Sequence, residues 1–221
     1  MTPRHFQEEL DHLKSLLVGM AGLAEEAVRG SVDALLTRDP DKAARVIGKD
    51  QQIDDLEVQI DNYVMSLLAL QQPLARDLRL ITMAMKISND LERVGDHAVN
   101  IAEMLKYLLQ APPFPVLPEI EEMQSVATQM LGGSLDAFIR GDSLEARRVI
   151  EQDDRVDDLH ENNFRILLTH MMEDPRKITA GMDLLLISGN LERIADLATN
   201  IAEDVVYLVE GRSIKHQPKP E

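Results

Sequence analysis

The chain is organised around the stretch LERVGDHAVNIAE at residues 91–103, which returns one hundred residues later as LERIADLATNIAE at 191–203. Nine of the thirteen positions are identical. An earlier stretch, DQQIDDL at 50–56, returns as DDRVDDL at 153–159. Segments that recur in the same order indicate an internal duplication. The sequence therefore predicts two similar halves.

Each copy of these stretches carries acidic residues spaced four apart. The eight acids are Asp50, Asp54, Glu92, Asp96, Asp153, Asp157, Glu192 and Asp196. Residues four apart share one face of an α-helix, where like charges repel each other. A cation bound between such carboxylates removes the repulsion. The pairs are therefore candidate metal ligands, and an ordinary solvated acidic face is the alternative.

The apolar residues recur every three or four positions, which is the pattern of amphipathic helices. The first predicted helix ends near Arg38, and the others cover about 40–71, 74–109, 119–140, 143–172 and 175–211. Aromatic residues make up 3% of the chain, a composition that suits helix packing better than sheets. Short connections make consecutive helices antiparallel neighbours. The predicted fold class is all-α, with six long helices in two tandem three-helix bundles.

Prolines separate the two halves. Pro112, Pro113, Pro115 and Pro118 fall within seven residues, as in an inter-domain linker. We therefore predict a first bundle at residues 1–110, a linker at 111–117, a second bundle at 118–211 and a flexible tail at 212–221.

The charge and composition exclude several functions. The formal net charge of −16 repels phosphate backbones and anionic lipid, so we expect no nucleic-acid partner. The chain has no Cys, and its apolar runs are too short for membrane insertion. The first ten residues lack the apolar run of a signal peptide, so we expect a cytoplasmic protein. We recognise no nucleophile–base pair and no Gly-rich phosphate loop, so we expect no enzyme.

The candidate metal site would use oxygen ligands almost exclusively. Such ligands suit Mg, Ca, Mn or Fe better than Zn, and carboxylates from adjacent helices could bridge more than one ion. His97 and His160 adjoin the acidic positions, but Leu197 and Glu57 occupy the matching places in the other half. We therefore predict that both histidines have ordinary surface or packing roles.

Two other functions must be weighed against a metal-binding protein of unassigned role. A di-iron oxidase or iron-storage bundle would carry Glu-x-x-His motifs beside facing glutamates. The chain has one such motif, at Glu9 and His12, outside the acidic stretches. The third possibility is a structural bundle whose acids bind nothing.

At residues 89–98, NDLERVGDHA, the chain resembles the PhoU family of phosphate-uptake regulators. The resemblance extends to FQEEL at 6–10, QPLARDLR at 72–79, both NIAE segments and the closing Glu210-Gly211. It implies two PhoU repeats, each a three-helix bundle. It also implies multinuclear clusters of Fe, Mn, Mg or Zn at the eight acids named above.

The resemblance further implies a role. Such a protein would be a cytoplasmic negative regulator of the phosphate-starvation response and of phosphate uptake. It would link the ATPase subunit of the phosphate ABC transporter to a PhoR-type sensor histidine kinase. Members of the family are often homodimers. The halves differ at Gly95 against Ala195 and at Asp61 against Phe164, so the resemblance does not imply equal metal content in the two sites.

Overall fold

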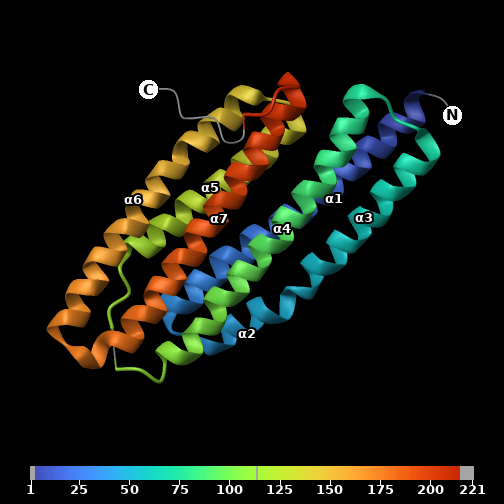
Figure 1. Ribbon diagram of the computed structural model, residues 1–221. Coiled ribbons are helices and arrows are strands. Elements are labelled where there is room, and N and C mark those ends of the chain that lie inside the picture. Colours follow the sequence, from blue (N-terminus) through green and yellow to red (C-terminus); the bar gives the residue numbers. More distant parts are fainter. Residues whose placement is uncertain (1–2, 113, 215–221) are drawn as a thin grey trace.

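The computed structural model describes residues 3–112 and 114–214, and this part of the chain is built from helices (Figure 1). The α-helices are α1 (Pro3–Thr37), α2 (Pro40–Lys49), α3 (Gln51–Gln71), α4 (Ala75–Leu108), α5 (Pro118–Arg140), α6 (Ser143–Glu173) and α7 (Ile178–Glu210). One 3-10 turn, η1 (Pro175–Lys177), precedes α7. The prediction of an all-α fold with six long helices is confirmed, and the second of these helices is divided into α2 and α3.

The division falls at Asp50, the first acid of the repeated motif. Its backbone keeps helical angles, with φ −57° and ψ −38°. Its carbonyl oxygen accepts hydrogen bonds from the backbone N–H groups of Ile53 at 2.8 Å and Asp54 at 3.2 Å. The three-residue bond is a tightened, 3-10-like turn. The chain therefore passes from α2 into α3 without leaving the helical path.

The helix ends follow the expected capping rules. Asp39 accepts hydrogen bonds from the backbone N–H groups of Asp41 and Lys42, and Pro40 occupies the first helical position. Gly141 ends α5 with φ +65°, a conformation that favours glycine. The predicted start of the last helix differs. Asp174 caps the turn η1, so α7 begins three residues later than Pro175.

The helices form two layers (Figure 1). One layer has the order α3, α4, α7, α6, in which neighbouring helices contact each other. Behind it, α1 lies against α4, and α5 lies against α6 and α7. Buried Leu, Ile, Val, Ala and Met side chains form one hydrophobic core that extends from α1 to α7. Because the core is continuous, the division into domains at 1–110 and 118–211 stays a prediction.

Polar contacts join the halves where α4 meets α7. The Nδ1 atom of His97 lies 2.9 Å from Oδ1 of Asn190. Burial lowers the pKa of His97, so the neutral ring donates its Nδ1–H to the amide oxygen. Lys86 reaches the nearly buried carboxylate of Asp204 at 3.5 Å. His97 therefore has the packing role predicted for it.

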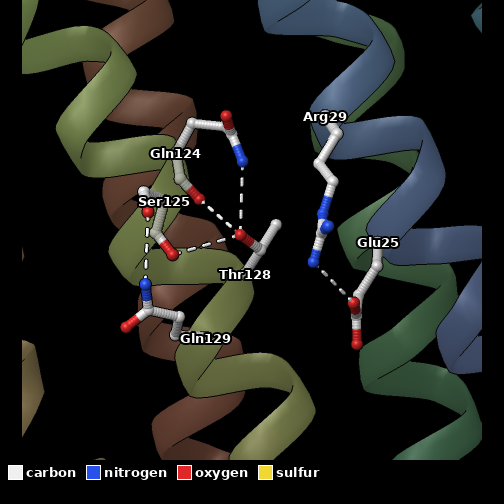
Figure 2. Close-up of polar contacts among 6 residues, drawn as sticks. All are labelled: Glu25, Arg29, Gln124, Ser125, Thr128 and Gln129. Atoms are coloured by element: carbon white, nitrogen blue, oxygen red, sulfur yellow. Dashed lines mark hydrogen bonds and ion pairs between the residues drawn. The ribbon is translucent and has the colours of Figure 1, made fainter.

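The back-layer helices α1 and α5 meet at a polar seam (Figure 2). Glu25 on α1 pairs with Arg29 at 3.1 Å, while burial raises the pKa of Glu25. Thr128 on α5 donates its hydroxyl hydrogen to backbone carbonyls of its own helix. A Cβ atom at Gly132 would lie 3.2 Å from Oε1 of Glu25. Glycine at this position lets the two helices approach closely.

Two further expectations concern the ends and the membrane. Ile214 packs against the core, and residues 215–221 of the predicted tail lie outside the described residues. Within 3–112 and 114–214, no helix has an apolar stretch long enough to cross a bilayer.

Candidate metal centre

The first pair of acidic motifs meets on neighbouring helices α3 and α4. Burial, followed by the negative charges of Asp96, Glu57, Asp54 and Asp50, raises the pKa of Glu92 from its ordinary 4.5 to about 7. Burial also raises the pKa of Asp50, followed by the charges of Asp54 and Asp96. The mutual repulsion shows that the structure brings these five carboxyl groups together. We call them the first acidic cluster.

Gly95 makes room for this cluster. A Cβ atom there would lie 2.9 Å from both Oδ1 of Asp50 and Cδ1 of Ile53. The carboxylate of Asp50 therefore rests directly against the backbone of α4, one residue before Asp96. A larger residue at position 95 would push the carboxylate of Asp50 away from α4 and from Glu92.

The second acidic cluster forms in the same way on α6 and α7. Burial raises the pKa of Asp196, and the charges of Glu192 and Asp157 raise it further, whereas Arg193 lowers it. Asp153 lies one turn before Asp157 on α6 and is partly buried. The structure therefore brings Asp157, Glu192 and Asp196 together, and Asp153 lies on the adjoining turn of α6.

The two clusters differ in their counter-charges and packing. In the first half, a guanidinium nitrogen of Arg93 lies 3.8 Å from Asp90, which is outside the cluster. In the second half, Arg193 acts on Asp196 itself. Ala195 replaces Gly95 and is fully buried, and Val156 replaces Ile53. The first cluster therefore carries the larger uncompensated negative charge.

The chemistry of both clusters suits a hard cation. Carboxylate oxygens are the preferred ligands of Mg²⁺, Ca²⁺ and Mn²⁺, and Fe also accepts them. Within the described part of the chain, however, no group of three or more His, Cys, Asp or Glu side chains is arranged to hold one metal ion. The acids share a face and repel one another without adopting ligand geometry. The predicted metal ligands, and the metal itself, stay predictions.

Two features of the site were not among the eight predicted ligands. Glu57 acts on Glu92 and thus belongs to the first cluster. Its counterpart in the repeat is His160, whose Nδ1 atom lies 2.8 Å from the hydroxyl of buried Ser188. The same hydroxyl accepts from Nδ2 of Asn163. His160 thus belongs to a buried polar network between α6 and α7, consistent with the predicted packing role.

The Glu-x-x-His motif lies elsewhere. The hydroxyl of Tyr63 donates to the carboxylate of Glu9, and the ring of His12 packs edge-on against Tyr63 with 5.1 Å between centroids. The motif therefore joins α1 to α3, because Glu9 contacts the hydroxyl of Tyr63 and His12 contacts its ring. This arrangement gives no support to the di-iron alternative.

The fold and the clusters define a class: a duplicated helical-bundle protein with two acidic faces. A model of the PhoU domain matches residues 17–105 and 120–205, so both halves carry the domain. The chain therefore belongs to the PhoU family, as its resemblance predicted. This assignment also confirms the prediction of two PhoU repeats.

Relatives extend over nearly the whole chain. A phosphate-specific transport system accessory protein PhoU homolog from Zymomonas mobilis is 41% identical over 99% of this chain and 92% of its own. The crystal structure of PhoU from Pseudomonas aeruginosa matches with a TM-score of 0.89 and 39% identity, over 94% of this chain and 100% of its own. The phosphate transport system regulatory protein PhoU from Streptococcus pneumoniae matches with a TM-score of 0.88 and 30% identity, over 95% and 99%. The Zymomonas relative is an accessory protein and the Streptococcus relative a regulatory protein, in agreement with the prediction that the chain is not an enzyme.

Proposed function

We propose that the protein is a cytoplasmic negative regulator of phosphate uptake and of the phosphate-starvation response. The observation that carries this proposal is the PhoU domain in both halves, together with whole-length similarity to phosphate transport accessory proteins. The proposed partners are the ATPase subunit of the phosphate ABC transporter and a PhoR-type sensor histidine kinase. A homodimer is the proposed oligomeric state.

The fold suits an adaptor of this kind. Four long helices lie side by side in one layer, so their outer faces offer extended surfaces to other proteins. Helix faces and grooves are common docking surfaces in protein recognition. Regulation would then depend on which partner occupies which face.

We further propose that cations bind at the two acidic clusters. The supporting observation is the raised pKa of Glu92 and Asp50 in the first cluster and of Asp196 in the second. The ligands would be Asp50, Asp54, Glu92 and Asp96 in the first half, and Asp153, Asp157, Glu192 and Asp196 in the second. Bound Mg, Mn or Fe would neutralise the repulsion and tie α3 to α4 and α6 to α7.

A gene deletion tests the regulatory role. In a strain without the gene, a reporter driven by a phosphate-starvation promoter should stay on when phosphate is plentiful, and the full-length gene should restore repression. Normal repression in the deletion strain would contradict the proposal. Pull-down of the transporter ATPase and the kinase with the full chain would test the partners separately.

A further inference from the structure

The outer face of α6 and α7 exposes large apolar side chains. Six side chains form what we call the apolar face: Phe164, Leu168, Met172, Ile178, Met182 and Leu186, each between 41% and 77% exposed. Three lie on α6 and three on α7, spaced four residues apart on each helix. Residues four apart lie on one side of a helix. Each helix therefore contributes one exposed apolar row.

Contacts between α6 and α7 set the register of the two rows. His160 meets Ser188, and a Cβ atom at Gly181 would touch the side chain of Met171. Because α6 and α7 are antiparallel, residues at the same level on the two helices have numbers that add up to about 350. At this register Phe164 is level with Leu186, Leu168 with Met182, and Met172 with Ile178. The two exposed rows therefore run alongside each other on neighbouring helices, and we call them the strip.

The strip leads into the second acidic cluster. Asp157 precedes Phe164 by seven residues, or about two turns, so both lie on the same side of α6. Asp196 follows Met182 by fourteen residues, or about four turns, on α7. The outer face is thus apolar toward the α6–α7 turn and negatively charged at its other end.

The cations at the turn have partners within the protein. Arg176 pairs with Asp174 at 3.0 Å, and Nζ of Lys177 lies 5.8 Å from the centre of the Phe114 ring. The charge that a partner meets beside the strip is therefore mainly that of the acidic cluster.

The first bundle has the same fold but a different surface. The matching positions are Asp61, Met65, Ala69, Leu78, Thr82 and Lys86. Asp61 and Lys86 there line an open surface depression together with Glu57 and Asn89. Met65 and Leu78 are exposed apolar side chains there too, but Asp61, Thr82 and Lys86 interrupt the rows. Rows that are apolar at all six places therefore occur on the second bundle and not at the matching places of the first.

We propose that the apolar face of the metal-free protein binds an amphipathic helix of a partner protein, with the basic end of that helix over Asp157, Glu192 and Asp196. Charge complementarity selects this occupant. A second copy of this chain would bring another acidic cluster and another net charge of −16 to the same place, and like charges would repel. A basic end satisfies the carboxylates, and an apolar side covers the six residues.

The length of the strip sets the size of the occupant. Asp157 and Met172 are fifteen residues apart on α6, so they are separated by about 22 Å along the helix. A helix of about four turns spans this distance. The proposal deepens the proposed regulatory role, because it names the face and the kind of partner, but its test needs neither the transporter nor the kinase.

The test measures binding of a fluorescein-labelled synthetic helix to the full chain by fluorescence anisotropy. The peptide carries Leu along one side and a Lys-rich last turn, and a second peptide has Glu in place of each Lys. EDTA in the buffer keeps the carboxylates free of metal. We expect the Lys peptide to bind at least about tenfold more tightly than the Glu peptide.

Protein variants locate the binding site. Phe164→Asp with Leu186→Lys installs residues that the first bundle already carries, so the fold should survive, and affinity for the Lys peptide should fall about tenfold. Leu168→Glu serves as an independent second variant. Met65→Glu, at the matching place in the first bundle, should change affinity by less than about twofold. Circular dichroism checks that each variant is folded.

Three results would overturn the proposal. The first is absence of binding of the Lys peptide to the wild-type chain, or equal binding of both peptides. The second is equal affinity of the Phe164→Asp, Leu186→Lys variant and the wild type. The third is self-association in sedimentation experiments that this variant abolishes, because a second copy would then cover the face.

Discussion

Replacing Glu92 with Gln should stabilise the metal-free protein at pH 8 and leave its stability at pH 5 almost unchanged. The carboxyl of Glu92 has its pKa raised from 4.5 to about 7 by burial and by four neighbouring acids. The folded protein therefore binds more protons than the unfolded chain between these two values. The stability that the protonated carboxyl of Glu92 contributes is fully present below about pH 4.5 and is lost as the pH rises to about 7.

The size of the effect follows from the same interval. About 2.5 pH units correspond to about 3.4 kcal/mol, and solvent screening of a partly exposed group reduces this to about 1–2 kcal/mol. Gln resembles the protonated acid in shape and charge, so it removes the loss at high pH. At pH 8 we expect the variant to be more stable than the wild type by that amount.

Urea denaturation in EDTA at pH 5 and pH 8 measures the difference. Glu103→Gln is the matched control, because Glu103 lies on the same helix but is exposed. It should change the free energy of unfolding by less than about 0.5 kcal/mol at either pH. If the free energy of unfolding of Glu92→Gln depends on pH in the same way as that of the wild type, then repulsion within the first cluster does not destabilise the folded protein.

Three further substitutions probe the packing around the sites and the helix ends. The effect of Gly95→Ala on the free energy of unfolding should be at least about 1 kcal/mol more favourable in an Ile53→Val background than in the wild type, because Val leaves room for the new Cβ atom. A double-mutant cycle by urea denaturation measures this coupling. Zero coupling would refute the close packing of Ile53 against Gly95. Asp39→Ala should cost about 1 kcal/mol through loss of the cap on α2, and an unchanged melting temperature would contradict the cap. Asp183→Asn should stabilise the protein at pH 8 by about 1 kcal/mol and have less effect at pH 4, because one of its carboxylate oxygens is buried without a hydrogen-bond partner and burial raises its pKa. A larger effect at pH 4 than at pH 8 would contradict that explanation.

The sequence predicted the helices well because their signals are local. Apolar periodicity, the Asp39-Pro40 cap and Gly141 depend on neighbours within one or two turns, and the structure has each of them in place. The sequence did not predict the division of a helix at Asp50. That division depends on a single tightened turn inside an otherwise uninterrupted periodic pattern.

The acidic clusters were predictable in part. Spacing by four residues places two acids on one helix face, and short connections make consecutive helices neighbours, so the meeting of Asp54 with Glu92 followed from the sequence. The side-chain directions did not follow. Arg93 turns toward Asp90, whereas Arg193 acts on Asp196, and only the packing of α4 and α7 decides between these arrangements.

The apolar face could not be foreseen from spacing alone. Phe164 and Leu168 continue the periodic pattern of α6, and a buried row would look the same in the sequence. Whether such a row is covered depends on the third helix of the bundle. Here α5 covers the opposite side of α6, as the contact of Asn163 with Met123 shows.

Calorimetric titration of the full chain with Mn²⁺ after removal of metal by a chelator tests the cation sites most directly. We predict binding at both clusters, with the first cluster tighter because Arg193 compensates part of the second. Glu92→Gln with Asp96→Asn should abolish the tighter phase, and Glu192→Gln with Asp196→Asn should abolish the weaker one. No binding by the wild type, or identical titrations for all three proteins, would contradict the account and would identify the acidic clusters as ordinary solvated surfaces.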